Sequence, residues 1–158
     1  MRVGIGFDIH RLVPDRPLIL GGVTVPHPTG LLGHSDADVL LHALCDALLG
    51  AAGAGDIGTY FPDTDPRWKN AASRIFVEKG LELVSTRGFK VGNVDLVVVA
   101  EQPKLAPYAQ AIRESIAQLL KVDETRVNLK ARTMEGLGPI GNGEAIACTA
   151  VVLLEDAG

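Results

Sequence analysis

Three side chains suited to metal binding stand out in this sequence, and two of them are near neighbours. Asp8 and His10 end an N-terminal run in which apolar residues alternate, so both fall on one face of a predicted strand. Gly4 and Gly6 precede them on that face and leave room for a close neighbour. His42 lies farther along, in an apolar run. One carboxylate and two imidazoles suit zinc, and three protein ligands leave a fourth position open for catalysis.

The clearest predicted helix follows Ser35, which is a good N-cap, and ends near Gly50 or Gly53. Asp36 and Asp38 would fall in its first turn, where negative charge meets the positive end of the helix dipole. Almost every following residue is apolar. We therefore expect a helix that is buried on most sides.

His42 would lie inside this helix, with Asp38 four residues before it and Asp46 four residues after it. The three would share one helical face, so a carboxylate could hold the second imidazole nitrogen. The alternative is a core histidine that its own helix satisfies. His34 stands beside the helix start, where backbone amides favour an anion, and its alternative is an ordinary loop histidine.

Composition narrows the possible classes of protein. The 158 residues fit one domain, spanning 1–158, that can bury a sizeable core. A formal net charge of -4 and the lack of a basic stripe argue against a nucleic-acid partner. No apolar run reaches membrane-spanning length and no signal peptide precedes the first strand, so we expect a cytoplasmic protein without a membrane partner. Cys45 and Cys148 lie in apolar segments and are predicted as small core residues.

The remaining sequence alternates strands and helices, which predicts an α/β (α+β) domain with a mixed sheet and helices on one face. Pro17–Pro26 is typical of a hairpin around Gly21-Gly22. Asp56, Asp63 and Asp65 could bind a cation or sugar hydroxyls, although turn chemistry explains Asp63 and Asp65 as well. The other expected elements are a helix over 70–87, a strand over 91–100, a helix over 107–121, a strand over 126–133, a loop over 136–143 and a strand over 145–154.

Several motifs, spread from the first strand to the last, together resemble the 2-C-methyl-D-erythritol 2,4-cyclodiphosphate synthases. Each motif alone is weak, but the set is specific. They are Gly6–His10, His34–Asp38, His42–Leu44, Gly55–Gly58, Phe61–Pro66, Gly92–Asp95, and Glu144 with Ile146–Cys148.

The resemblance implies an enzyme, a phosphorus–oxygen lyase of the non-mevalonate isoprenoid pathway. Its substrate is 4-diphosphocytidyl-2-C-methyl-D-erythritol 2-phosphate, whose 2-phosphate attacks the β-phosphorus and expels CMP. Two anionic groups must meet, so cations are needed to cancel their repulsion. The resemblance places one zinc ion per subunit on Asp8, His10 and His42, with a β-phosphate oxygen as fourth ligand.

The same resemblance implies that Glu135 holds a second divalent ion, Mg²⁺ or Mn²⁺, across the α- and β-phosphates, although a plain loop carboxylate is the alternative. His34 and Thr133 match catalytic positions that steady the transferring phosphoryl group, and we assign Asp46 to the support of His42. The matching substrate contacts are Asp8, Ile9, His10, His34, Ser35, Asp56, Ile57, Gly58, Phe61, Pro62, Asp63, Thr64, Asp65, Ala100, Glu101, Gln102, Pro103, Lys104, Leu105, Ala106, Ala131, Arg132, Thr133, Met134 and Glu135.

The family forms homotrimers with active sites between subunits and strands facing the threefold axis. The apolar last strand suits such an interface, although the helices alone could cover it. Three residues depart from the family pattern. Arg132 replaces a small hydroxyl residue near the nucleotide, Pro139 replaces an aromatic residue, and Asn142 replaces an arginine that can bind an isoprenoid diphosphate. We therefore expect weak binding of such diphosphates.

Two other classes of function fit the same ligand set. A zinc-dependent phosphohydrolase would use it to activate water and would release linear products. A metal-stabilised trimeric binding module would use it only for stability.

Overall fold

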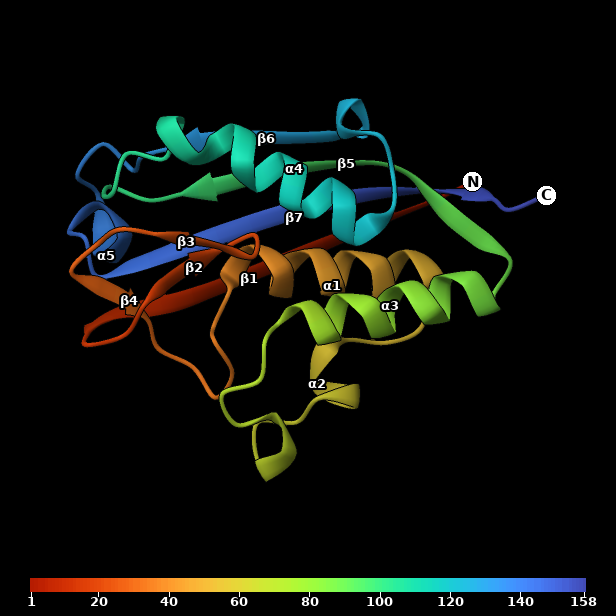
Figure 1. Ribbon diagram of the computed structural model, residues 1–158, viewed down its shortest axis with the longest axis horizontal. Coiled ribbons are helices and arrows are strands. Elements are labelled where there is room, and N and C mark those ends of the chain that lie inside the picture. The colour runs from red at the N-terminus through yellow and green to blue at the C-terminus, as the bar shows by residue number, and fades with distance from the viewer.

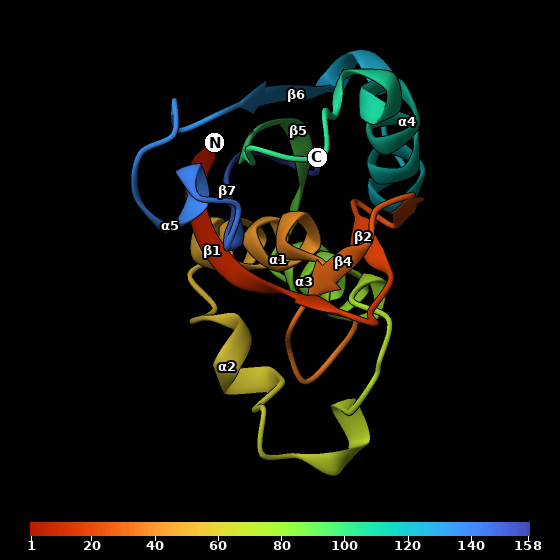
Figure 2. The same cartoon turned by 90° about the vertical axis from the view of Figure 1, so that its left-hand side faces the viewer.

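Five strands form a mixed sheet in the order β4-β1-β7-β5-β6 in the computed structural model, which describes residues 1–158 (Figure 1). Only β5 and β6 run parallel, and α4 lies in the connection between them. Figure 2 shows α1, α3 and α4 on one side of the sheet. The elements are β1 (Arg2–Pro14), β2 (Leu18–Leu20), β3 (Val23–Val25), β4 (Thr29–Leu31), α1 (Val39–Ala52), α2 (Ile57–Tyr60), η1 (Pro66–Trp68), α3 (Arg74–Thr86), β5 (Phe89–Val99), η2 (Ala106–Tyr108), α4 (Ala109–Leu120), η3 (Glu124–Arg126), β6 (Val127–Arg132), α5 (Gly138–Gly141) and β7 (Ala145–Asp156).

The central helix α1 is buried along almost its whole circumference, as its apolar sequence predicted. It packs against β1 and β7 on one side and against α3 on another. The only residues of α1 that are not buried are His42, Asp46 and Gly50. They repeat every four residues and so form one stripe along the helix. This stripe is the surface on which α1 can place functional side chains in contact with a ligand.

Strand β1 lies unusually close to α1 because it turns glycines toward the helix. A Cβ atom at Gly6 would come within 1.9 Å of the Ala43 carbonyl oxygen, and one at Gly4 within 2.0 Å of the Ala47 carbonyl oxygen. The prediction that these glycines admit a close neighbour is confirmed. Their face also carries Asp8, which therefore lies against the stripe of α1 that His42, Asp46 and Gly50 form.

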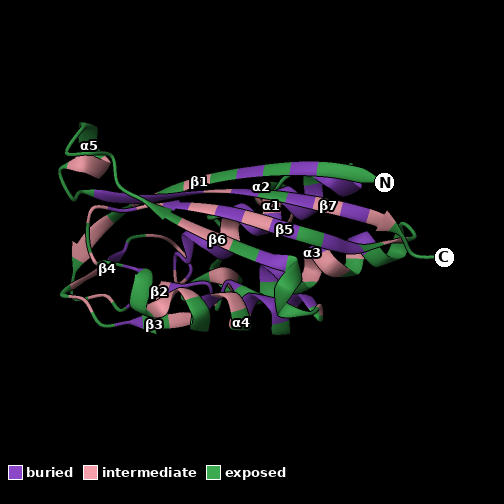
Figure 3. Cartoon of the chain, turned by 90° about the horizontal axis from the view of Figure 1, so that it is seen from above, coloured by how far each residue is buried: buried purple, intermediate pink, exposed green.

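The opposite face of β1 is apolar and open to solvent. Its side chains alternate with the glycines along the strand, as the green and purple bands of Figure 3 show. Their exposed fractions are 66% for Val3, 69% for Ile5, 59% for Phe7 and 45% for Ile9. A soluble monomer rarely leaves so many large apolar side chains together in water.

The start of α1 differs from the prediction. The helix begins at Val39 with Asp38 as its N-cap, and not after Ser35, because Ala37 adopts a left-handed φ of 58°. The Asp38 carboxylate accepts from the backbone N–H groups of Gly21, at 2.9 Å, and of Leu41, at 3.1 Å. The hypothesis that the Asp38 carboxylate holds His42 is wrong, because these two backbone donors and a third one occupy that carboxylate.

The third donor to Asp38 is Gly22 N–H, at 2.7 Å. Gly21 and Gly22 form the turn between β2 and β3, with φ of 61° and 79°, so the predicted hairpin is confirmed. Burial raises the pKa of Asp38 to about 6, and the three backbone donors oppose that rise. Asp38 thus ties the hairpin turn to the start of α1.

We expect Asp38→Asn to lower the free energy of unfolding by about 1–3 kcal/mol, because the amide nitrogen cannot accept and one of the three backbone N–H groups loses its acceptor. Urea unfolding followed by circular dichroism measures this change. Asp123→Asn is the control, since Asp123 also caps a helix but is exposed. Equal unfolding midpoints for Asp38→Asn and wild type would contradict this assignment.

Smaller differences from the predictions concern helix ends and the last loop. The segment predicted as a loop over 136–143 contains the short helix α5, and the helix predicted over 107–121 is divided into η2 and α4. The last strand is longer than predicted and lies in the centre of the sheet. Cys45 and Cys148 are free and buried, as predicted. No helix is long and apolar enough to cross a membrane.

Candidate metal centre and substrate pocket

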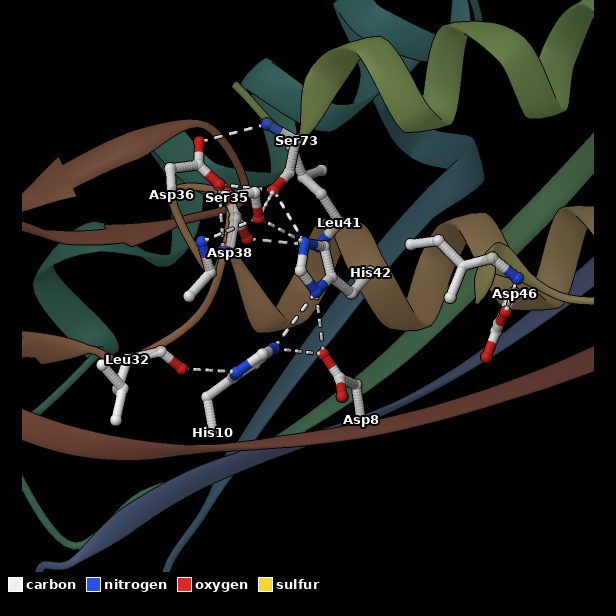
Figure 4. A network of polar contacts seen from close by, with 12 residues as sticks. Asp8, His10, Leu32, Ser35, Asp36, Asp38, Leu41, His42, Asp46 and Ser73 are labelled. Atoms are coloured by element: carbon white, nitrogen blue, oxygen red, sulfur yellow. Dashed lines mark hydrogen bonds and ion pairs between the residues drawn. The ribbon is translucent and has the colours of Figure 1, made fainter. Parts of the chain in front are cut away.

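Asp8, His10 and His42 converge at the contact between β1 and α1 (Figure 4). Asp8 Oδ2 lies 2.8 Å from His10 Nε2 and 3.1 Å from His42 Nδ1. The two imidazole nitrogens lie 3.1 Å apart. Two neighbouring residues of β1 and one distant residue of α1 therefore present three ligand atoms in a nearly equilateral triangle.

The dimensions of this triangle fit a tetrahedral zinc ion. Bonds of about 2.0–2.1 Å at tetrahedral angles place neighbouring ligand atoms about 3.3 Å apart. The observed edges are only a few tenths of an ångström shorter. Two imidazoles and one carboxylate are also the ligand types that zinc takes in catalytic sites. The residues present therefore fit this ion.

The imidazole of His10 is oriented by the backbone. Its Nδ1–H donates to the Leu32 carbonyl oxygen at 2.8 Å, because a carbonyl can only accept. This bond leaves the lone pair on Nε2, which faces Asp8. His10 can therefore bind a metal through Nε2.

The negative charge of the Asp8 carboxylate favours a bound cation. Burial raises the pKa of Asp8, but hydrogen bonds to His10 and His42 and the charges of both outweigh it and lower the pKa to about 2. For His10, burial lowers the pKa, and the hydrogen bond and charge of Asp8 outweigh that effect and raise it. Asp8 is thus ionised at neutral pH, and a metal would displace any imidazole proton shared with it.

The second imidazole nitrogen of His42 has different partners from those predicted. Nε2 lies 2.8 Å from the Ser73 hydroxyl oxygen and 3.1 Å from that of Ser35. Asp46, assigned to this role from the sequence, accepts instead from the Ile57 backbone N–H at 2.7 Å. Asp46 lies one turn farther along α1, so its carboxylate reaches the start of α2 and not the imidazole ring.

The three ligand atoms border a hollow of about 500 Å³. His34 lines it and donates from Nε2–H to the Asp65 carbonyl oxygen at 2.8 Å, which joins the segment before α1 to the loop that carries Asp63 and Asp65. Aromatic rings of Phe61, Trp68 and Phe76 pack edge to face or tilted along the same wall. Other predicted contacts that line the hollow are Ser35, Ile57, Gly58, Pro62 and Asp63.

A second hollow, of about 210 Å³, is lined by another group of the predicted site residues. It shares no residue with the first. Thr133 lines this second hollow. The Thr133 hydroxyl lies 3.4 Å from the Glu135 carboxylate. The remaining predicted residues around it are Ala100, Glu101, Pro103, Lys104, Leu105, Ala106, Ala131 and Arg132. Within one chain, the two halves of the predicted site are therefore separate.

Other predicted contact residues border neither hollow. Ile9 points to the opposite face of β1, because successive side chains of a strand alternate. Asp56 caps α2 by accepting from Thr59 N–H, and the Asp65 carboxylate pairs with Arg67 at 2.6 Å, so both serve turns in this chain. Thr64, Gln102, Met134 and Glu135 also lie outside the linings of both hollows.

The sequence patterns did not predict the residues that support the metal-binding side chains or line the pocket beside them. Leu32 acts through its backbone carbonyl, which no side-chain pattern reveals. Ser73 falls inside the helix predicted over 70–87, whereas in the structure it is the N-cap of α3. Trp68 and Phe76 line the pocket but look like ordinary core residues in the sequence. No local spacing links any of them to His42.

Fold and site together define an α+β protein with a candidate three-ligand metal centre beside a pocket that has an aromatic wall. A model of the YgbB family matches residues 1–155. A relative from Gloeobacter violaceus, named 2-C-methyl-D-erythritol 2,4-cyclodiphosphate synthase, is 59% identical over 156 residues, which cover 99% of this chain and 96% of the relative. The chain belongs to the YgbB family. Its relatives that are named 2-C-methyl-D-erythritol 2,4-cyclodiphosphate synthase are enzymes.

Solved structures agree with this membership. A 2C-methyl-D-erythritol-2,4-cyclodiphosphate synthase in its CDP-bound form superposes with a TM-score of 0.90 at 44% identity, covering 98% of this chain and 100% of that one. The bifunctional IspDF from Campylobacter jejuni superposes with a TM-score of 0.94 at 46% identity. This chain spans 42% of the bifunctional one, so the match concerns one part of that protein.

Proposed function

We propose that this protein converts 4-diphosphocytidyl-2-C-methyl-D-erythritol 2-phosphate to 2-C-methyl-D-erythritol 2,4-cyclodiphosphate and CMP, as a phosphorus–oxygen lyase of isoprenoid biosynthesis. In this reaction an oxygen of the 2-phosphate forms a bond to the β-phosphorus. The bond from that phosphorus to the oxygen bridging to the α-phosphate breaks, and CMP leaves with the bridging oxygen. The nucleophile is already an anion, so positioning and charge neutralisation matter more than a strong base.

The observation that carries this proposal is the triangle of Asp8 Oδ2, His10 Nε2 and His42 Nδ1 at the edge of the pocket. These residues would hold zinc, which supplies positive charge against a phosphate oxygen when bound. The pocket would keep the flexible substrate in its cyclising shape, and such positioning can remove up to about 7–11 kcal/mol of a barrier. His34 and Ser35, at the start of α1, would contact the phosphates.

We also propose that the active enzyme is a homotrimer in which the second hollow of one subunit completes the first hollow of its neighbour. Two observations support this. The apolar face of β1 is open to solvent, and the predicted site is divided between hollows that share no residue. In the trimer, Thr133 would steady the transferring group, and Glu135 would hold a second ion, Mg²⁺ or Mn²⁺.

The remaining assignments stay predictions. The hollow lined by Ala100 and Ala131 would take the cytidine, and a synthase of this name has a CDP-bound form. Asp56, Ile57 and Gly58 would form the erythritol pocket, and Asp63 would contact the substrate. A cytoplasmic location and weak isoprenoid diphosphate binding, due to Asn142, also remain expectations from the sequence.

One assay tests the proposed reaction. Incubation with the cytidyl substrate and zinc, followed by mass spectrometry, should yield CMP and the cyclic product together. In water enriched in ¹⁸O, neither product should gain the label. Labelled linear products would identify a phosphohydrolase instead, and stable zinc binding without turnover would identify a binding module. Light scattering during size-exclusion chromatography measures the subunit number, and a monomer that turns over substrate would overturn the shared site.

A further inference from the structure

We propose that Asp36 and Ser73 form a carboxylate–hydroxyl relay that fixes the tautomer of His42, so that its Nδ1 is the nitrogen that binds metal. Both are positioning residues, since Ser73 contacts His42 only at Nε2, away from the three ligand atoms, and Asp36 acts through Ser73. The inference rests on the proposed zinc site and assigns a role to two residues outside it.

The relay follows from which groups can donate. An ionised Asp36 carboxylate only accepts hydrogen bonds, so the Ser73 hydroxyl donates its proton to Asp36 Oδ1. The Ser73 oxygen is then an acceptor for His42 Nε2, which lies 2.8 Å away. The imidazole proton is therefore held on Nε2. The lone pair remains on Nδ1, which faces Asp8 at 3.1 Å.

The Asp36 carboxylate is itself fixed by the backbone. Its Oδ1 accepts from Asp38 N–H at 3.1 Å, and its Oδ2 accepts from Ser73 N–H at 3.1 Å. Two backbone bonds join the same two segments, from Asn70 N–H to the His34 carbonyl and from Asp36 N–H to the Ala71 carbonyl. The relay therefore stands on a rigid junction between the starts of α1 and α3 (Figure 4).

The Ser73 hydroxyl is not used for the task that serines usually perform at helix starts. Ser73 is the N-cap of α3, but its side chain makes no capping hydrogen bond. A serine cap normally satisfies a backbone N–H of the first turn. Here the side chain is fully buried, and its hydroxyl joins Asp36 to His42. Removing this hydroxyl costs no cap bond and so tests the relay directly.

Ser35 provides a matched comparison within the site. Its hydroxyl oxygen lies 3.1 Å from the same His42 Nε2 and is almost as buried as that of Ser73. It accepts from Ala37 N–H at 3.1 Å, and no carboxylate stands behind it. Ser35→Ala therefore removes a hydroxyl at the same nitrogen but leaves the relay in place.

The test compares zinc affinity and imidazole tautomer in metal-stripped full-length protein. Competition with a chromogenic chelator should show a zinc affinity about 10–100-fold weaker in Ser73→Ala than in wild type, and a much smaller loss in Ser35→Ala. Long-range ¹H–¹⁵N spectra of zinc-free protein should show His42 protonated at Nε2 in wild type. Ser73→Ala should give a mixture with the Nδ1–H form.

Asp36→Ala removes the acceptor of the Ser73 proton and keeps the Ser73 hydroxyl, and it should change zinc affinity and tautomer in the same direction as Ser73→Ala. This second variant tests the relay even if Ser73→Ala has a folding defect. Unchanged zinc affinity and tautomer in these variants, with wild type binding zinc, would overturn the relay alone. Failure of wild type to bind zinc would instead overturn the proposed zinc site.

Discussion

His42→Ala is expected to abolish zinc binding and CMP release together. The substitution removes one of the three ligand atoms, and Asp8 and His10 alone offer two. A bound metal contributes several kcal/mol to charge stabilisation in the transition state, so we expect CMP release to fall at least about 10³-fold. Steady-state assays of CMP formation and chelator competition for zinc measure both effects.

Zinc should also stabilise the wild-type fold and not that of the variant. At a zinc concentration of ~100 Kd, ligand binding adds about 2.7 kcal/mol to the free energy of unfolding. Chemical denaturation with and without zinc should show this gain in wild type and none in His42→Ala. His27→Ala is the control, because His27 lies in a loop and touches neither hollow. A zinc-free His42→Ala enzyme with full activity would refute the assignment.

Gly6→Ala should both destabilise the fold and weaken the metal site. A Cβ atom there would lie 1.9 Å from the Ala43 carbonyl oxygen and 2.8 Å from the Ala47 backbone nitrogen. Both are helix backbone atoms that cannot rotate away, so β1 and α1 must separate. We expect a loss of about 3 kcal/mol or more in the free energy of unfolding, at the upper end for overpacked sites.

This separation should disturb the ligand triangle, because Asp8 lies on β1 and His42 on α1. Metal–ligand bond lengths normally lie within about 0.2 Å of their usual values, so moving Asp8 away from His42 strains the bonds to a shared ion. Chelator competition should therefore show weaker zinc binding in Gly6→Ala, measured at denaturant concentrations where the variant stays folded. Wild-type stability and zinc affinity in this variant would contradict the idea that glycine sets the strand–helix distance.

Gly50→Ala is the matched control on the same helix. The nearest atom to a Cβ there is the Ile5 carbonyl oxygen, at 3.9 Å, so the methyl group fits without movement. Alanine is favoured over glycine inside a helix by about 1 kcal/mol. We expect Gly50→Ala to stabilise the protein slightly and to leave zinc affinity unchanged, which separates the effect of an added methyl group from that of a clash.

Local patterns were sufficient for much of the fold and for the ligand set. Alternation along β1 placed Asp8 and His10 on the glycine face, because side chains of a strand repeat every two residues. The apolar run of α1 predicted its burial, and Gly21-Gly22 predicted the hairpin, since each depends on neighbours in sequence. The start of α1 was predicted wrongly, because the left-handed Ala37 and the contacts of Asp38 depend on distant segments.

The sequence by itself determined which side chains can bind metal and which faces of β1 and α1 carry them, because period and composition are local properties. Only the tertiary structure decided what surrounds those ligands. Ser73 and Leu32 reach His42 and His10 from segments whose positions depend on packing of the whole sheet and its helices. A hydrogen bond between residues 31 positions apart leaves no periodic trace in the chain, so the partners of His42 became visible only once β1, α1 and α3 were placed together.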